Sequence, residues 1–282
     1  MEEFKEGKQL LLHHYNMIHI KTSAEIELIR ISALLVSQTL SELAKLVKPG
    51  VSSELLNNRA EEFILDNGAI PSFKNYKGYP FATCISINDA VVHGFPNNYE
   101  IREGDLVSID VGVYKNGFHG DSAYTFGVEP VLEEHKLLMS VTRTSLNLGI
   151  EKAHLGNRVG DISAAIQDFA ERKHHFGVVR ELVGHGLGRN LHEDPQVPNF
   201  GKKGTGPKLK DGMVIAIEPM INLGSRDVFY DEDGWTVRTK DAKFSAHYEH
   251  TICVKRGKAD ILSSFVDIIQ SEISNPYLVD SY

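Results

Sequence analysis

The stretch Asp110-Val-Gly-Val-Tyr-Lys-Asn-Gly-Phe-His-Gly-Asp121 decides the fold. Strand-forming residues flank Asn116-Gly117, and this pair is typical of a two-residue type I′ hairpin turn, which needs a positive φ at both positions. In that register Gly112 faces Asp121. The alternative, a three-residue turn, places Asp110 and Asp121 on opposite faces of the hairpin.

The two-residue turn brings two carboxylates onto one face. Asp110 and Asp121 are then diagonal neighbours, with Cα atoms about 7–8 Å apart, and Gly112 leaves room between them. Two converging carboxylates repel each other unless a proton or a cation lies between them. The hairpin therefore predicts a site that binds a proton or a cation.

The composition excludes several classes of protein. The chain has 282 residues, of which 41% are hydrophobic and 24% charged, as in ordinary globular domains. Its net charge of −8 argues against non-specific binding to DNA or RNA, although it leaves a local basic patch open. We find no apolar run of the ~18 residues that cross a bilayer and no basic leader at the start. Cys84 and Cys253 are too few for a disulfide scaffold, so we expect a cytoplasmic protein.

Helical and strand patterns alternate along the first half of the chain. Thr22 and Glu25 form a capping box at the start of a helix whose apolar residues recur to Val47. A second helix is expected over 53–66. Shorter apolar runs predict strands over 81–87, 90–93 and 105–114.

The second half repeats this plan. Residues 102–110 align with residues 210–218, and His119-Gly-Asp121 matches His247-Tyr-Glu249. Duplicated halves would each contribute two carboxylates, near a pseudo-twofold axis. We expect helices over 133–153 and 161–173, and strands over 178–184, 213–221 and 246–255.

Histidines interrupt apolar segments at three further places. His185 lies in Leu182-Val-Gly-His-Gly-Leu-Gly188, where flanking glycines let backbone approach a ligand closely, and His93 and His192 are weaker candidates. A structural or solvent-facing role is the alternative for each histidine. Carboxylates are depleted in strands, so four acids in strand-like segments indicate a specific role. Carboxylate oxygens together with imidazoles favour a site for Mn, Fe, Co or Zn.

These residues resemble a known family. In chain order, Asp110, Asp121, His185, Glu218 and Glu249 resemble the five metal ligands of the methionine aminopeptidases. The flanking segments agree as well: Cys84-Ile-Ser-Ile-Asn88, His93-Gly94, Gly117-Phe-His-Gly-Asp121, Gly184-His-Gly-Leu-Gly188, His192-Glu-Asp-Pro-Gln-Val197, Ile217-Glu-Pro219 and Asp233-Gly-Trp-Thr-Val237.

The resemblance covers about residues 17–260. The short spacing between His185 and Glu218 is similar to that of the type I, bacterial-style branch. The implied fold is α+β, the pita-bread fold, with two pseudo-symmetric halves and a curved, mainly antiparallel sheet covered by helices. The expected parts are a mobile N-terminal extension over 1–16, one catalytic domain over 17–268 with half-repeats of about 20–130 and 131–260, and a C-terminal tail over 269–282.

The resemblance also implies a metal centre. Asp121 and Glu249 would bridge two divalent ions, Asp110 would complete one site, and His185 with Glu218 would complete the other. A water activated by the metals would hydrolyse the first peptide bond of a polypeptide. The implied partners are the N-termini of nascent polypeptides, met at the ribosome, and we expect a monomer.

Further roles follow from the same resemblance. Glu218 would carry the proton to the leaving amine, His192 would stabilise the oxyanion, and His93 would hydrogen-bond the scissile amide. The methionine side chain would lie in an apolar, polarizable pocket. The pocket residues would be Tyr76, Tyr79, Cys84 and Trp235, and a monovalent cation would lie beside Asn88, Ala90 and Ser245.

Three positions depart from the family pattern. Gly112 replaces a small hydroxyl residue, Leu191 an aromatic residue, and His247 a glutamine. Two alternatives stay open: an X-Pro aminopeptidase or dipeptidase of the same fold, and a non-catalytic pita-bread module that binds peptides. The first usually carries a large extra N-terminal domain, and the second typically loses ligands.

Overall fold

The computed structural model describes residues 18–279, so the expected extension over 1–16 and the last three residues of the tail lie outside the described range. The helices are α1 (Ser23–Ala44), α2 (Ser53–Asp66), α3 (Glu133–Lys152), α4 (Val159–Gln167), which continues as a π-helical turn over Asp168–Lys173, and α5 (Val266–Ser274), together with a 3₁₀ turn over Tyr76–Gly78. None of these helices is long and apolar enough to span a bilayer.

Fifteen strands are described, and every ladder between them is antiparallel. The strands are β1 (Ile70–Pro71), β2 (Thr83–Ile87), β3 (Ala90–Val92), β4 (Leu106–Lys115), β5 (Phe118–Gly127), β6 (Gly177–Val178), β7 (Gly184–Gly186), β8 (Glu193–Val197), β9 (Val214–Ile217), β10 (Met220–Asn222), β11 (Val228–Tyr230), β12 (Val237–Thr239), β13 (Ser245–His247), β14 (His250–Cys253) and β15 (Asp260–Ile261).

The hairpin of β4 and β5 has the register expected from its turn. Gly112 pairs with Asp121, and both Asn116 and Gly117 have a positive φ, as a type I′ turn requires. The capping box at the start of α1 is also confirmed, since Thr22 Oγ1 accepts from the N–H of Glu25 and the Glu25 carboxylate accepts from the N–H of Thr22.

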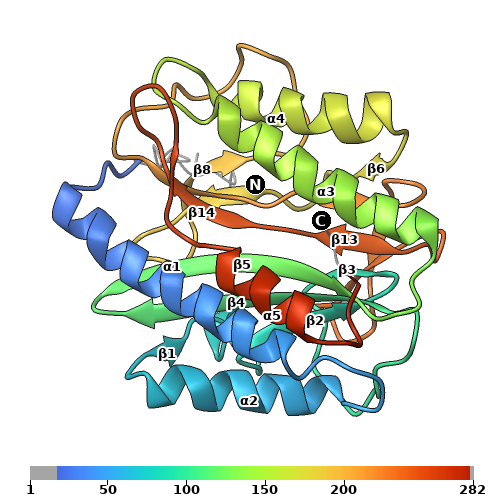
Figure 1. Cartoon of the computed structure of the whole chain (residues 1–282). Helices are drawn as coiled ribbons and strands as arrows, with labels where there is room; N and C mark the ends of the chain where they lie inside the picture. Colours follow the sequence, from blue (N-terminus) through green and yellow to red (C-terminus); the bar gives the residue numbers. More distant parts are fainter. Residues whose placement is uncertain (1–17, 280–282) are drawn as a thin grey trace, which may run out of the picture.

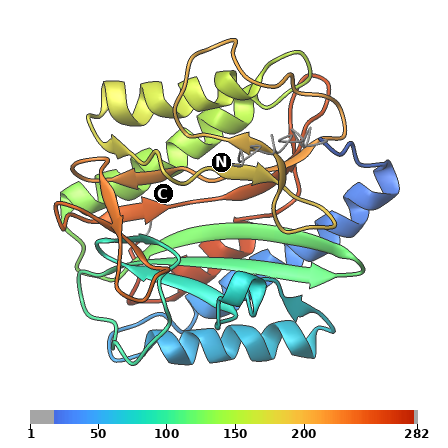
Figure 2. The same ribbon diagram turned by 180° about the vertical axis from the view of Figure 1, so that it is seen from behind.

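Helices cover one face of the strands. Figure 1 shows α1 and α5 in front of β4 and β5, and α3 and α4 over the other half, while Figure 2 shows the strands from the opposite side. A Cβ on Gly120 would lie 2.3 Å from the Ala33 nitrogen of α1, so Gly120 faces the helices. Alternation along β5 then turns Asp121 away from them. The functional face is therefore the one without the helices.

Three expected strands are interrupted. The run over 213–221 breaks at Glu218-Pro219, because proline has no N–H for a ladder. The run over 246–255 breaks at Tyr248-Glu249, where the Glu249 N–H donates instead to the Ala123 carbonyl of β5. In the run over 178–184 only Val178 and Gly184 belong to strands, and Glu181, Leu182 and Val183 between them line a pocket.

Hydroxyl side chains join the two halves. Thr251 Oγ1 accepts from the Asp121 N–H and donates to the Asp121 carbonyl. Ser122 Oγ donates to the Glu249 carbonyl, and Thr125 Oγ1 exchanges hydrogen bonds with the backbone of His247. These bonds hold β5 of the first half against the segment of the second half that carries the matching carboxylate.

The C-terminal segment packs on the domain. In α5, Ser271 Oγ lies 2.9 Å from Ser41 Oγ of α1, and Asn275 Nδ2 donates to the Ala44 and Val47 carbonyls. These bonds satisfy carbonyl groups that the end of α1 leaves unpaired. The helix α5 thus crosses the expected boundary at residue 268 and completes the cover of the first half.

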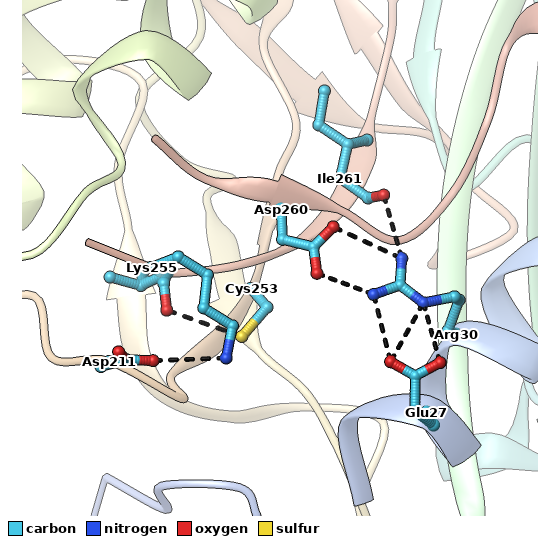
Figure 3. A network of polar contacts seen from close by, with 8 residues as sticks. Glu27, Arg30, Asp211, Cys253, Lys255, Asp260 and Ile261 are labelled. Carbon is cyan, nitrogen blue, oxygen red and sulfur yellow. Dashed lines mark hydrogen bonds and ion pairs between the residues drawn. The ribbon is translucent and has the colours of Figure 1, made fainter. Parts of the chain in front are cut away.

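A polar network ties α1 to the β14–β15 hairpin. Figure 3 shows Arg30 between Glu27 and Asp260, with a 2.7 Å distance from Arg30 Nη2 to Asp260 Oδ2 and a further bond to the Ile261 carbonyl. Beside it, Lys255 pairs with Asp211. Because α1 belongs to the first half and the hairpin to the second, this network restrains the halves from the outside.

Candidate metal centre and active site

The residues expected to be functional gather in one pocket. Its volume is about 290 Å³, and every residue expected to bind the divalent metals or the substrate, or to act in catalysis, lines it. They are Tyr76, Tyr79, Cys84, His93, Asp110, Asp121, His185, His192, Glu218, Trp235 and Glu249. The wall also includes residues that the sequence analysis did not select: Phe73, Lys77, Val92, Glu181, Leu182, Val183 and Met220.

Carboxylates and one imidazole converge at the base of this pocket. The nitrogen and oxygen atoms of Asp121, His185 and Glu249 lie within 4.8 Å of one another. Nε2 of His185 is 3.9 Å from Asp121 Oδ2 and 3.5 Å from Glu218 Oε1. Asp110 reaches the same pocket from β4, on the face of the hairpin that also carries Asp121.

Burial disfavours the charged form of each of these acids. Burial raises the pKa of Asp110 to about 7. Burial also raises the pKa of Asp121, Glu218 and Glu249, and the negative charges of neighbouring acids raise these three pKa values further. Within residues 18–279, Asp110 Oδ1, Asp121 Oδ1 and Glu249 Oε1 are buried without a hydrogen-bond partner. Four such acids need protons or cations between them.

The donor set fits a divalent metal. Buried oxygen atoms without partners and one neutral imidazole are ligands that Mn, Fe, Co and Zn accept. His185 is suited to this role because its Nδ1 lies 3.0 Å from the Gly186 carbonyl, which assigns the ring proton to Nδ1. Burial lowers the pKa of His185 to about 4, so Nε2 faces the acids with a free electron pair.

The glycines on both sides of His185, expected to let backbone approach a ligand, instead let neighbouring strands approach. A Cβ on Gly184 would lie 2.4 Å from the Ala216 carbonyl oxygen, and one on Gly186 would lie 2.3 Å from the Asp194 carbonyl oxygen. These glycines therefore let neighbouring strands approach β7, which positions His185, and they do not make room for a ligand. Gly112 likewise accommodates the ring of Phe73, because a Cβ on Gly112 would lie 2.6 Å from Cε1 of that ring.

One side of the pocket is apolar. Leu191 packs with Phe73, Tyr79 and Cys84, and Tyr76 and the indole of Trp235 lie against this cluster. The ring of Trp235 meets that of Tyr79 edge to face at 5.2 Å, and the Tyr79 hydroxyl donates to the Thr83 and Gly94 carbonyls. The Tyr79 hydroxyl is therefore already bonded to the backbone, which fixes the position of this ring in the wall.

Two further imidazoles border the acids. Nδ1 of His192 lies 3.0 Å from the Tyr76 hydroxyl, and the His192 ring lies 4.2 Å from that of His185 between centroids. His93 has a φ of 57°, a strained conformation for a residue other than glycine, and burial lowers its pKa to about 4. Both rings are neutral near pH 7.

Asn88, Ala90 and Ser245 lie together outside this pocket. The Ser245 N–H donates to the Asn88 carbonyl, while the Asn88 side chain bonds to Asp105 and to the Leu106 N–H. The three residues thus meet where β3 approaches β13.

The comparisons with known proteins agree with this geometry. The sequence pattern of the family described as "Metallopeptidase family M24" matches residues 27–256. The methionine aminopeptidase of Clostridium perfringens is 51% identical over 88% of this chain and 99% of its own length. The chain belongs to metallopeptidase family M24, among the methionine aminopeptidases. A crystal structure of the enzyme from Rickettsia prowazekii superposes with a TM-score of 0.86 at 41% identity, over 88% of this chain and all of that one.

Prolidases share the fold at lower similarity. The prolidase from Pyrococcus furiosus has a TM-score of 0.71 at 23% identity, over 87% of this chain and 65% of that one. This likeness shows the pita-bread architecture alone. The α+β fold expected from the sequence is confirmed, and the relatives favour the methionine aminopeptidases over the X-Pro peptidases and the non-catalytic module.

A buried ion pair supports the loop that carries His192. Nζ of Lys21 lies 2.6 Å from Glu193 Oε2, and the two side chains are only 5% and 4% exposed. Lys21 also donates to the His19 carbonyl, and the other oxygen of Glu193 accepts from the Asn190 N–H. The segment before α1 therefore anchors the residue next to His192.

We predict that Lys21→Met destabilises the fold by about 3–5 kcal/mol, because it leaves the Glu193 carboxylate buried without its partner. Adding Glu193→Leu should restore most of the loss, since both charges are then gone. Urea unfolding measures both variants. Lys45→Met, which breaks the exposed pair with Glu42, is the control and should cost about 1 kcal/mol or less. Equal losses in the single and double variants would contradict the role of the pair.

Proposed function

We propose that this chain removes the N-terminal methionine from peptides and nascent proteins by metal-assisted hydrolysis of the first peptide bond. The observation that carries the proposal is the single pocket, which combines four acids and His185 at its base with an apolar aromatic wall. The 51% identity to a methionine aminopeptidase supports the same reaction.

We further propose two divalent ions, of Mn, Fe, Co or Zn. Asp121 and Glu249 would bridge them, with Asp110 on one side and His185 with Glu218 on the other. When bound, the metals would supply Lewis-acid polarisation of the scissile carbonyl and lower the pKa of water. The buried oxygens without partners support this ligand set.

Side chains of the protein would carry out the remaining steps. Glu218 would take a proton from the attacking water and pass it to the leaving amine. The Tyr76 hydroxyl can donate to Nδ1 of His192, which leaves the N–H at Nε2 to stabilise the developing oxyanion. His93 would hydrogen-bond the scissile amide. The free α-amine of the substrate would lie near Asp110, which restricts cleavage to the first residue.

Specificity would follow from the apolar wall. Tyr76, Tyr79, Cys84 and Trp235 would surround the first side chain, and a thioether is flexible and polarizable enough to fill such a space. A hydrophobic pocket separates similar side chains by only ~1–3 kcal/mol per methylene, so norleucine should also be accepted. A monovalent cation beside Asn88, Ala90 and Ser245 would brace β3 against β13.

We place the protein in the cytoplasm as a monomer that meets its substrates at the ribosome. Both cysteines are free thiols, in keeping with a reducing compartment. Nine lysines and arginines and no acid occur in segments 152–158, 202–210 and 255–258. Backbone bridges at His154–Lys255 and Arg158–Lys208 put these segments side by side, so the described part of this acidic chain has a basic region suited to ribosomal RNA, with Asp211 paired to Lys255 at its edge.

The basic region predicts salt-dependent binding to ribosomes. Replacing Lys202, Lys203 and Lys208 with glutamate should abolish co-sedimentation with ribosomes at low salt, because phosphate contacts are lost. The same reversal at Lys173, Lys240 and Lys243, which lie outside the region, is the control. Co-sedimentation of both variants alike would contradict the assignment of this surface.

Metal-stripped protein reloaded with Mn, Co, Fe or Zn tests the function directly. It would be given Met-Ala-Ser, Lys-Ala-Ser and Ala-Pro-Ala, and the released residue would be identified. We expect metal-dependent release of methionine from the first peptide alone. Cleavage only before proline would move the protein to the X-Pro peptidases, and inactivity of folded protein with every metal would favour a binding module.

Variants separate metal binding from chemistry. Asp121→Ala or Glu249→Ala should abolish both metal loading and turnover, because each removes a bridging ligand. His192→Ala should lower kcat about 10²–10³-fold while metal content stays near normal. Metal content by mass spectrometry and peptide kinetics measure both effects, with Asp267→Asn on the exposed face of α5 as the control. Full turnover in a ligand variant would overturn the assignment, as would metal loss in His192→Ala.

A further inference from the structure

A buried imidazole with no assigned role faces the active site. His247 is 2% exposed and lies in β13, where it pairs with Met220 of the pocket wall. Cross-strand partners share a face of the sheet, so the His247 ring points toward the pocket side. Within residues 18–279, its Nε2 is buried and makes no hydrogen bond.

A carboxylate oxygen of Glu218 lies close to this nitrogen. Nε2 of His247 lies 3.8 Å from Glu218 Oε2, while the other oxygen of that carboxylate, Oε1, lies 3.5 Å from His185 Nε2. The carboxylate thus lies between two imidazoles, one facing each oxygen. Its main chain is fixed separately, because Asn199 Nδ2 donates to the Glu218 carbonyl.

The position of the His247 ring is set by the first half of the molecule. Thr125 Oγ1 of β5 accepts from the His247 N–H and donates to its carbonyl, at 2.9 and 2.8 Å. These two bonds fix the backbone of His247. Only the two side-chain torsions can then move the imidazole, so its Nε2 has a narrow range of positions. A shift of less than about 1 Å brings it to hydrogen-bond distance of Glu218.

We propose that His247 is a positioning residue for Glu218: its Nε2–H donates to Oε2 and fixes the plane of the carboxylate. Oε1 is then left to act beside His185. The proposal rests on the proposed function of Glu218 as ligand and proton carrier. Hydrogen-bonded partners of this kind orient metal-binding side chains, and their loss typically costs about 10–100-fold in metal affinity or activity.

The same geometry explains a departure from the family pattern. The sequence resemblance leads us to expect glutamine at position 247, and a glutamine amide can also donate an N–H to a carboxylate. The donor function would therefore be kept in either residue, while the ring restricts its direction more tightly. This makes His247→Gln a conservative variant and His247→Ala or His247→Leu the disruptive ones.

The test titrates metal-stripped protein with Mn²⁺ by calorimetry and then measures kcat and KM on Met-Ala-Ser. We expect His247→Ala and His247→Leu to lose about tenfold or more in Mn²⁺ affinity or in kcat, with KM changed little. His247→Gln should stay within about threefold of the wild type. Thermal unfolding identifies variants that fail to fold, and leucine keeps the core filled where alanine leaves a cavity.

A second buried imidazole provides the matched control. His135 is 7% exposed and stacks on Phe244 at 4.1 Å between ring centroids, but it does not line the pocket. His135→Ala should therefore leave Mn²⁺ affinity and kcat unchanged. If removing any buried ring had the same general effect, His135→Ala would lose as much Mn²⁺ affinity or kcat as the His247 variants.

Two results would overturn the proposal: a folded His247→Leu with wild-type Mn²⁺ affinity and kcat, or a His247→Gln that falls as far as His247→Leu. Failure of the proposed function looks different. If the wild type binds Mn²⁺ but does not cleave Met-Ala-Ser, the methionine assignment is wrong, while the calorimetric comparison of His247 variants still tests the contact with Glu218.

Discussion

Mutual repulsion among four buried carboxylates is the constraint on which the rest of the structure depends. Asp110, Asp121, Glu218 and Glu249 approach one another where little water reaches them, and burial raises the pKa of each. Such a cluster opposes folding unless cations or protons compensate it. The surrounding core, the helices on one face and the networks at the edges hold these acids together despite that cost.

The arrangement of the two halves follows from this constraint. Each half contributes two acids, and short hydroxyl side chains on β5 and β14 join the backbones that carry them. Asp110 and Asp121 reach the pocket from a regular ladder, whereas Glu218 and Glu249 reach it from positions between strands.

Neighbouring groups set the positions of the imidazoles in and beside the pocket. The Gly186 carbonyl determines the tautomer of His185, and the Tyr76 hydroxyl contacts Nδ1 of His192. The buried pair of Lys21 and Glu193 holds the His192 loop, and Thr125 anchors His247. A metal centre of this kind is thus a property of a second layer of hydrogen bonds as much as of its ligands.

The sequence by itself determined the elements whose cause is local. The turn at Asn116-Gly117 sets the register of β4 and β5, and the capping box starts α1, because both depend on residues a few positions apart. It also identified the four acids, the three histidines and part of the apolar wall of the pocket, but not the rest of its lining. The break at Glu249, the strand contacts that require glycine beside His185, and the position of His247 against Glu218 came only from the tertiary structure. These features arise where distant strands meet, and contacts between distant strands leave no periodic trace in the chain.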